Sequence, residues 1–283
     1  MDDRAAVLPP EGRRTALVAA VRSAGFLRVA DAALELGVSE VTVRADLAAL
    51  DAAGLVRRVH GGATATGSLG GETSLEQTGE RDAAIKRAIG VAAAARIRPG
   101  ESVLLDVGST ALAVARALVA RTDLVGVTVI TNGLSIALEL EAAIPRFTVV
   151  VTGGTLRPLQ HSLVNPLGTT LLAGLNADVA ILGCNGVDGD GLVTNLNLPE
   201  AEVKRAMLGA AVRRILVVDG SKAGIRRLGT IGALAEFDAV VTDGRALPLL
   251  AEPAAAGGVE LVVVDAGPAS PGAAAIGAGV TER

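Results

Sequence analysis

Residues 29–62, which read VADAALELGVSEVTVRADLAALDAAGLVRRVHGG, constrain the fold of this chain more than any other segment. A helix-forming run ends at Gly37, a residue that tolerates the positive φ of a helix C-terminus. Ser39 then stands where an N-cap is favoured, at the start of a second helical run. A turn and a basic strand follow. This order predicts a winged helix-turn-helix, whose main use is to place one helix in the major groove of DNA.

The second helix of this motif has a predicted buried face and a predicted DNA-facing side. If Val43, Leu47 and Leu50 form the buried stripe, their i, i+4, i+7 spacing fixes the orientation of the helix. A rotation of about 100° per residue then places on the opposite side Val41, Arg44, Ala45 and Ala48, with Thr42 on the flank. In that orientation Arg44 can pair with guanine, Val41 can touch a thymine methyl group, and Thr42 can contact a base edge or a phosphate.

Further candidates surround this helix. Ser39 and Glu40 lie at its start, where backbone N–H groups meet phosphate. The wing and the start of the preceding helix supply basic side chains for phosphate or minor-groove contacts. The candidate DNA-binding residues are therefore Arg28, Ser39, Glu40, Val41, Thr42, Arg44, Arg57, Arg58 and His60. The alternative is a small helical module with solvated arginines that binds a protein instead.

Composition limits the number of domains and the kinds of nucleic-acid binding that the chain can have. A chain of 283 residues, half of them apolar, suits two domains with a sizeable core. With three Phe, no Trp and no Tyr, it lacks the aromatic platforms of single-stranded nucleic-acid binders. The net charge of −4 and an N-terminal domain that is only locally basic argue against tight non-specific DNA binding.

No metal, cofactor or membrane is expected from the sequence. Cys184 is the single cysteine, which excludes an intramolecular disulfide and a cysteine-based metal site, and His60 and His161 show no metal-ligand spacing. No apolar run approaches the roughly 20 residues that cross a bilayer. The start, MDDRAAVLPP, lacks the basic-then-apolar layout of a signal peptide, so we expect a cytoplasmic protein.

The chain divides into four predicted segments. The winged helix-turn-helix domain spans 8–63, with the helix-turn-helix motif at about 29–48 and a preceding helix that follows Pro10, includes 15–21 and ends near Gly25. Residues 64–80 are small, polar and glycine-bearing, as in a linker. An α/β domain spans 81–265. The tail 266–283 has low complexity and is expected to be disordered.

The α/β domain begins with a predicted helix at 82–96, after which short β-rich runs alternate with helical stretches rich in Ala and Leu. The predicted strands are 102–106, 127–131, 148–152, 179–183, 215–219, 239–243 and 261–265. Apolar strands that alternate with helices indicate a mostly parallel sheet covered on both faces.

Polar, glycine-containing segments follow several of these strands. They are 106–110 (DVGST), 131–133 (TNG), 152–155 (TGGT), 183–188 (GCNGVD) and 219–222 (DGSK). Ligands of open α/β sheets bind beyond the carboxyl ends of the strands. The GST segment, which leads into a helix, offers backbone N–H groups and two hydroxyls as a phosphate cradle.

Each polar candidate has a purely structural alternative. Asp106 either binds sugar hydroxyls or ties down a loop, and Lys222 either meets an anionic group or is solvated. Glu200 and Lys204, four residues apart on a predicted helix, could form only an exposed ion pair. Cys184 is expected to be a small buried residue, and His161 is either a polar pocket wall or structural.

Several motifs occur together and in a fixed order: SEVTVRADL, GLVRRVHGGA, DVGST, VITN, GGTLR, GCNGVDGDGLVTNLNLPEAEVKRAML and VDGSK. In these motifs the chain, from about residue 13 to 243, resembles bacterial DeoR-family transcriptional regulators. The resemblance implies an N-terminal winged helix-turn-helix that binds double-stranded operator DNA. It also implies a C-terminal sensor similar to sugar-phosphate isomerases and glucosamine-6-phosphate deaminases, which senses a phosphorylated sugar that commonly releases a repressor from DNA. Family members form homodimers or homotetramers.

Residue by residue, the resemblance implies a set of effector contacts. They are Asp106, Gly108, Ser109, Thr110, Thr131, Asn132, Gly153, Gly154, Asn185, Gly186, Asp188, Glu200, Lys204 and Lys222. One position departs from the family: many members carry a second arginine after the one matched by Arg44, and here that residue is Ala45. The groove-facing side thus loses a charge, which bears on operator strength and base preference.

Two functions follow from these features. The first is a DNA-binding regulator, a repressor of sugar-metabolism genes whose affinity for DNA is linked to the binding of a sugar phosphate. The second is a sugar-phosphate isomerase or deaminase with a regulatory head, in which Asp188 and Glu200 would move protons. The related deaminase pattern has a histidine soon after the aspartate, and GVDGDGLVT has none. We therefore expect a regulator and assign no catalytic residue.

Overall fold

A computed structural model of the chain describes residues 9–24, 26–53, 55–59, 61–65 and 74–266. The described residues fall into two compact units, one within residues 1–73 and the other within 74–283. His60 and residues 267–283 of the predicted tail lie outside the described residues.

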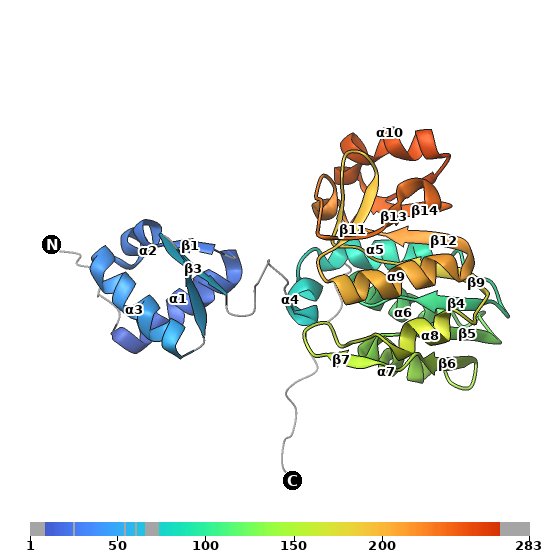
Figure 1. Ribbon diagram of the computed structural model, residues 1–283, viewed down its shortest axis with the longest axis horizontal. Coiled ribbons are helices and arrows are strands. Elements are labelled where there is room, and N and C mark those ends of the chain that lie inside the picture. Colours follow the sequence, from blue (N-terminus) through green and yellow to red (C-terminus); the bar gives the residue numbers. More distant parts are fainter. Residues whose placement is uncertain (1–8, 25, 54, 60, 66–73, 267–283) are drawn as a thin grey trace, which may run out of the picture. The chain divides into compact units, whose positions relative to one another are not determined.

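The described residues of the smaller unit form three helices and one antiparallel sheet with the strand order β1-β3-β2. Its elements are α1 (Pro10–Ala24), β1 (Phe26–Arg28), α2 (Val29–Leu36), α3 (Glu40–Ala52), β2 (Val56–Val59) and β3 (Gly62–Ala65). Helices α2 and α3 form the predicted helix-turn-helix, and β2 and β3 form the wing (Figure 1). The predicted winged helix-turn-helix is confirmed.

Two helix caps set the turn between α2 and α3. Gly37 ends α2 with φ of 62°, the left-handed conformation that favours glycine. Ser39 caps α3, and its side chain accepts a hydrogen bond of 3.2 Å from the backbone N–H of Thr42. Both caps are those that the sequence predicts.

The buried side of α3 contains one charged residue besides its apolar stripe. Val43, Leu47 and Leu50 are buried as predicted, and Asp46 is buried beside them. Arg13 and Arg14 of α1 both donate to the Asp46 carboxylate. Burial raises the pKa of Asp46, but the hydrogen bonds and charges of the two arginines outweigh it and leave that pKa below its ordinary value. This ion-paired group joins α1 to α3.

The larger unit contains a seven-stranded sheet in which every neighbouring pair is parallel. In spatial order its strands are β15 (Glu260–Val264), β14 (Ala239–Asp243), β12 (Ala211–Val217), β9 (Ala177–Leu182), β4 (Ser102–Leu105), β5 (Val127–Thr131) and β6 (Phe147–Val151). All seven predicted strands are present, although β12 begins at Ala211 rather than at Ile215.

Helices cover both faces of this sheet (Figure 1). One face packs against α5 (Ala83–Ala94), α6 (Ser109–Ala120) and α7 (Leu134–Leu140), and the other against α8 (Leu167–Leu172), α9 (Leu198–Gly209) and α10 (Leu247–Gly257). Alternate residues of β4 divide between the two cores: Val103 and Leu105 join the first, and Leu104 the second. The predicted α/β class is confirmed.

Some elements were not predicted. Two small antiparallel sheets comprise β7 (Thr155–Arg157) with β8 (Ser162–Val164), and β10 (Gly186–Val187), β11 (Leu192–Asn195) and β13 (Gly229–Ala233). The predicted linker 64–80 includes the end of β3 and a short helix, α4 (Leu75–Glu80). A capping box, in which the side chains of Ser74 and Gln77 each accept from the other's backbone N–H, starts this helix.

The order of the strands creates a topological switch point between β4 and β9. From β4 the chain proceeds outward through β5 and β6, and from β9 it proceeds in the other direction through β12, β14 and β15. In open α/β sheets, ligands bind at the carboxyl ends of the strands at such a point. Asp106 directly follows β4 and Gly183 directly follows β9, so both lie at this position.

Candidate functional site

The predicted groove-facing side of α3 is open to solvent within the smaller unit. Val41 is 72% exposed, Arg44 and Ala45 are exposed, and Thr42 and Ala48 are half-buried. In the free protein Arg44 forms an exposed i,i+4 ion pair with Glu40, so any base contact by Arg44 must compete with that carboxylate. The helix thus presents the side chains that the sequence places on this side.

The other DNA candidates lie at the edges of the same unit. Arg28 is exposed at the junction of β1 and α2. Arg58 is exposed on the wing, and its backbone N–H donates to the Asp51 side chain at 3.1 Å. The backbone of Arg57 pairs with that of Thr64 in the wing. His60, also proposed from the sequence, lies outside the described residues.

Asp106 is a fully buried carboxylate at the larger unit's switch point. Its side chain is 0% exposed. Oδ2 accepts a hydrogen bond of 2.9 Å from the Gly183 N–H and a further one from Lys204 Nζ. Lys204 Nζ also donates to the Gly183 carbonyl at 3.2 Å. These contacts join the ends of β4 and β9 to α9 through a single buried ion pair.

Helix α9 places Glu200 and Lys204 on its buried side. Asn197 caps the helix by accepting a hydrogen bond of 3.1 Å from the Glu200 N–H, and Pro199 lies in the first turn. Both side chains are nearly fully buried, Glu200 at 4% and Lys204 at 3% exposure. The alternative of an exposed Glu200–Lys204 ion pair is therefore wrong, because each residue pairs with a different element of the fold.

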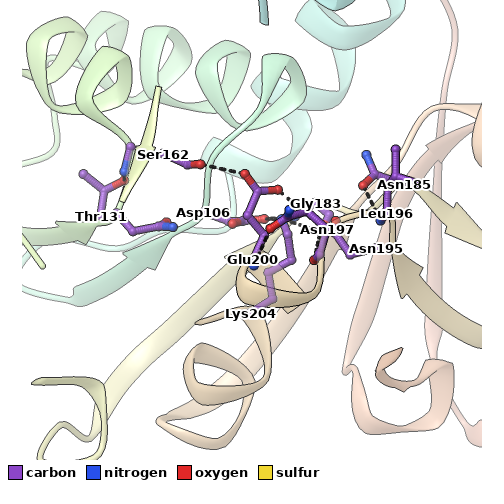
Figure 2. A network of polar contacts seen from close by, with 12 residues as sticks. Asp106, Thr131, Ser162, Gly183, Asn185, Asn195, Leu196, Asn197, Glu200 and Lys204 are labelled. Carbon is purple, nitrogen blue, oxygen red and sulfur yellow. Dashed lines mark hydrogen bonds and ion pairs between the residues drawn. The ribbon is translucent and has the colours of Figure 1, made fainter. Parts of the chain in front are cut away.

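The Glu200 carboxylate accepts hydrogen bonds from side chains of three other segments. Oε1 accepts from Arg157 and, at 2.6 Å, from the Ser162 hydroxyl, and Oε2 accepts from Asn195 Nδ2 at 3.3 Å. Figure 2 shows Glu200 and Lys204 extending from α9 toward Ser162 and Asp106, respectively. The structure thus brings Asp106, Glu200 and Lys204 into one buried polar group, although they are distant in sequence.

Burial dominates the electrostatics of this group. It raises the pKa of Asp106, while the ammonium group of Lys204 and the Gly183 N–H act in the opposite direction. It also raises the pKa of Cys184 to about 12, against the charges of Lys204 and Lys222. The Cys184 thiol therefore stays protonated at neutral pH, which suits a structural rather than a nucleophilic role.

Thr131 and Asn132 lie at the end of β5, beside this group. The Thr131 hydroxyl oxygen accepts from the Gly133 N–H at 3.0 Å. Asn132 forms two hydrogen bonds with Leu163, one to its carbonyl at 3.1 Å and one from its N–H at 2.7 Å. Asn132 therefore connects the end of β5 to the β7–β8 hairpin, while Thr131 fixes the turn that follows β5.

The glycine-rich candidates have two kinds of role. Gly108, with φ of 106°, precedes α6, and it is half-buried together with Ser109 and Thr110 at the start of that helix. Gly154, with φ of 128°, follows Gly153; a Cβ atom there would lie 2.2 Å from the Val164 carbonyl oxygen. The hairpin thus requires a glycine at position 154 for its own geometry.

Asn185, Gly186 and Asp188 hold the small sheet together. Asn185 Oδ1 accepts from the Leu196 N–H at 2.8 Å, and a Cβ atom on Gly186 would lie 2.3 Å from the Ile225 carbonyl oxygen. Asp188 accepts from two backbone N–H groups of its own turn and pairs with Arg226. Burial raises the pKa of Asp188, yet these donors outweigh it and leave that pKa lowered. Its hydrogen-bonding capacity is thus used in the β10–β11 turn.

Lys222 is half-buried after β12, in the short 3₁₀ segment Gly220–Lys222. Its backbone N–H donates to the Asp219 carbonyl at 3.0 Å, whereas its ammonium group has no hydrogen-bond or ion-pair partner among the described residues. Its positive charge acts to lower the pKa of the Cys184 thiol and that of the Lys86 ammonium group. It is therefore a cation near the carboxyl ends of the strands that remains available to an anionic ligand.

The sequence analysis missed the partners of Glu200. Arg157, Ser162 and Asn195 surround its carboxylate, and all three come from strands that were not predicted. A signal existed, because Arg157 belongs to GGTLR and Asn195 to VTNLNLPE, which carry the family resemblance. Because the segment around Glu200 offers no obvious partner for its carboxylate other than Lys204, basic and polar residues of these motifs were candidates for that role.

Four buried side-chain oxygens have no hydrogen-bond partner in the part of the chain that the structure describes: Asp106 Oδ1, Asn132 Oδ1, Asn165 Oδ1 and Thr242 Oγ1. Two of them, Asp106 Oδ1 and Asn132 Oδ1, lie at the ends of the neighbouring strands β4 and β5. Leaving a buried polar atom without a partner costs about 1–3 kcal/mol. Both atoms accept hydrogen bonds, so they are matched by a ligand that donates them, as hydroxyl groups do.

The described ranges contain no cluster of three or more His, Cys, Asp or Glu side chains that could hold a metal ion. No helix within them has the length and apolar character needed to cross a membrane.

Comparison with known protein families decides the classification. The DeoR-like helix-turn-helix domain matches residues 13–68, and the DeoR C terminal sensor domain matches residues 81–244. The chain belongs to the DeoR family. The two matched regions coincide with the helix-turn-helix unit and with most of the parallel sheet, including the Asp106–Lys204 pair.

Relatives of this DeoR-family protein match over most of their length. It is 34% identical to the HTH-type transcriptional regulator GlpR of Haloferax volcanii, over 84% of this chain and 91% of that protein. It is 32% identical to the transcriptional repressor CsqR of Escherichia coli, over 82% and 87%. These relatives are regulators, so the prediction of a regulator rather than an enzyme is confirmed.

Solved structures give a weaker match. Ribose 5-phosphate isomerase A of Methanocaldococcus jannaschii is 18% identical to this DeoR-family chain, covers 49% of it and 53% of its own length, and has a TM-score of 0.36. A similarity of this size assigns no activity.

Removal of the buried cation should make the dependence of stability on pH steeper. Burial already raises the pKa of Asp106 in the wild type, and in a Lys204→Met variant it acts without the opposing ammonium group, so this pKa rises further. A carboxyl whose folded-state pKa lies above its unfolded value of 3.8 contributes stability below that value and loses it as pH rises toward the folded-state pKa. The variant continues to lose stability above the pH at which the wild-type carboxyl has ionised, so its free energy of unfolding relative to wild type should fall there by up to about 1.4 kcal/mol per pH unit.

Urea unfolding at several pH values measures this difference. Lys222→Met is the matched control, because it removes an ammonium group that has no ion-pair partner among the described residues. A deficit of the Lys204→Met variant that stays constant from pH 4 to pH 9 would contradict the assignment of Lys204 as the cation that offsets the burial of Asp106.

Proposed function

We propose that this protein is a repressor of sugar-metabolism genes, that it binds double-stranded operator DNA through α3 and the wing, and that a phosphorylated sugar bound at the β4–β9 switch point controls it. The observation that carries the proposal is the presence of both parts in one chain. One is an exposed recognition helix, and the other is a buried polar group at the ligand-binding edge of a parallel sheet. The relatives support it, since one is the glycerol-3-phosphate regulon repressor of Escherichia coli.

The DNA-binding part of the proposal rests on side chains of the smaller unit. Arg44, Val41 and Thr42 would face base edges, while Ser39 and Glu40 would lie near phosphate at the start of α3. Arg28, Arg57, Arg58 and His60 would contact the DNA backbone or the minor groove. Ala45 adds no charge on this side of α3, so Arg44 supplies its one guanidinium group among residues 39–48. We infer from this partner that the protein acts in the cytoplasm, where operator DNA lies.

The sensor part of the proposal assigns roles by chemistry. The unpaired acceptors of Asp106 and Asn132 suit sugar hydroxyls. The start of α6, with Gly108, Ser109 and Thr110, and the ammonium group of Lys222 suit a phosphate. The remaining polar residues at this edge of the sheet would line the site beside the ligand: Glu200, Lys204 and Thr131. The other candidates would act mainly by shaping the surrounding loops: Gly153, Gly154, Asn185, Gly186 and Asp188.

Control of DNA binding requires linkage between the two units. A sugar phosphate that lowers operator affinity must bind more tightly to the DNA-free protein by the same factor. We propose that a homodimer or homotetramer performs this function, as the family resemblance implies, because paired recognition helices match the two halves of a palindromic operator.

Substitution of Arg44 tests the orientation of the recognition helix. Arg44→Ala should weaken binding to a duplex from the protein's own promoter region by about 10- to 100-fold, equivalent to about 1–3 kcal/mol for a bidentate guanine contact. Arg58→Ala should weaken binding to that duplex and to an unrelated duplex by similar factors. Fluorescence anisotropy at fixed salt gives both affinities.

The control for this experiment is Arg98→Ala, which removes an exposed arginine from the larger unit. It should leave both affinities unchanged. Promoter affinity that survives Arg44→Ala would mean that another side of α3 faces the bases.

A thermal-shift screen tests the sensor assignment. The panel contains glycerol 3-phosphate, ribose 5-phosphate, fructose 1-phosphate, fructose 6-phosphate and glucosamine 6-phosphate, with ribose, fructose and inorganic phosphate as controls. At 100 times its Kd, one of the phosphorylated sugars should stabilise the larger unit by about 2.7 kcal/mol, which raises its Tm by about 5–10 °C.

Two glutamates of α9 provide matched variants for the screen. Glu200→Gln should abolish the shift, because Glu200 is buried at the site. Glu202→Gln, which makes the same change on the exposed side of the helix, should preserve it. A shift equal in both variants would place the ligand elsewhere, and no shift with any phosphorylated sugar would remove the support for a sugar-phosphate sensor.

A further inference from the structure

The β7–β8 hairpin, residues 155–164, contacts the polar group of the switch point along its strands. Arg157 of β7 and Ser162 of β8 both donate to the Glu200 carboxylate. Leu163 of β8 exchanges hydrogen bonds with Asn132, one of whose side-chain atoms is an unpaired buried acceptor. Figure 2 shows Ser162 pointing to Glu200 from this side. Two candidate effector residues are therefore held directly by the hairpin.

The turn of the same hairpin contacts α4. The Leu75 N–H, at the first position of α4, donates to the Leu159 carbonyl oxygen at 3.0 Å. One residue further on, Glu76 Oε1 lies 3.6 Å from His161 Nε2. One side of the hairpin thus meets the candidate effector site, and its turn meets the N-terminus of α4.

The two strands of the hairpin are closely packed against each other at the base, and its turn is fixed to α7. At the base, Gly154 leaves no room for a Cβ atom against the Val164 carbonyl. In the turn, His161 has a φ of 51° and is fixed to α7: its ring nitrogen Nδ1 lies 2.6 Å from the Ser135 hydroxyl, and its carbonyl accepts from the Leu134 N–H at 2.9 Å. A displacement at Arg157 or Ser162 would therefore be carried to the turn.

Helix α4 is the first described element of the larger unit after residue 73, so the chain from the smaller unit enters the larger one there. The other end of α4 is held independently. Lys86 of α5, which is buried, donates to the carbonyl oxygens of Thr78 and Arg81. The N-terminal half of α4 is held by the hairpin and its C-terminal end by Lys86.

We propose that the 155–164 hairpin conveys the state of the effector site to α4, and through α4 to the chain that leads to the DNA-binding unit. The proposal rests on the proposed function, because it specifies how that site is regulated. Binding of a sugar phosphate beside Glu200 changes the contacts of Arg157 and Ser162, the hairpin shifts, and the N-terminus of α4 loses or gains the hydrogen bond from Leu75 to Leu159.

Amide hydrogen exchange of the full chain, without any sugar phosphate, tests the coupling from the site to α4. Arg157→Gln removes the charged donor to Glu200 at the end of β7, without changing the turn residues that contact α4. We expect it to accelerate exchange of α4 amides, including that of Leu75, by about tenfold or more. Arg213→Gln is the matched control: Arg213 also joins two segments through a partly buried ion pair, with Glu101, and should leave α4 unchanged.

A substitution in α4 tests the coupling in the opposite direction, from the helix to the candidate effector site. Leu75→Pro removes the N–H that bonds to Leu159 at a helix position where proline is favoured, and Ser74 already has the extended conformation that precedes proline. We expect it to accelerate exchange of the Leu163 amide by about tenfold. Leu75→Ala shortens the side chain but keeps the N–H, and should have a smaller effect.

Either experiment alone can overturn the proposal. Unchanged α4 exchange in a folded Arg157→Gln variant, or equal exchange of Leu163 in the Leu75→Pro and Leu75→Ala variants, would show that the hairpin does not couple the two places. Neither measurement contains a sugar phosphate. A negative result would therefore reject the coupling and leave the sensor assignment to the thermal-shift screen.

Discussion

The buried ion pair between Asp106 and Lys204 is the interaction on which the arrangement of the larger unit's candidate site depends. It joins β4, β9 and α9 at the one position where the strand order reverses. Transfer of two such charges from water costs several kcal/mol for each ion, and well-packed apolar residues often stabilise a fold equally well. The location of the pair at a ligand-binding edge is therefore better explained by the site than by stability.

The polar neighbours extend from this pair in two directions. On one side, Lys204 leads along α9 to Glu200, whose carboxylate binds the hairpin. On the other side, β4 neighbours β5, where Asn132 binds the same hairpin. The hairpin therefore closes a ring of contacts around the candidate site.

Local signals were enough to predict the helix-turn-helix and the main sheet. Gly37 and Ser39 act within their own turns, and the seven strands are short apolar runs bounded by polar residues, so the sequence carries their signals directly. Strands β7, β8 and β10 are too short for a period-two pattern to appear. Helix α4 was assigned to a linker because its capping box lies in a segment rich in glycine and polar residues.

Long-range pairing was the part that the sequence did not reveal. The i,i+4 spacing of Glu200 and Lys204 is compatible with an exposed pair and with two buried side chains, and only the tertiary partners Arg157 and Asp106 distinguish them. Asp46 is a similar case. It falls within the buried stripe of α3 at helical spacing, but its burial depends on two arginines that precede it by more than thirty residues.

A crystal structure of the full chain with a bound sugar phosphate would show whether the β4–β9 switch point is the effector site. We expect density for the sugar at the ends of β4 and β5, with a hydroxyl donating to Asp106 or Asn132 and the phosphate near the start of α6 or Lys222. Density for the sugar at another place, with the Asp106, Glu200 and Asn132 contacts unchanged, would contradict this assignment.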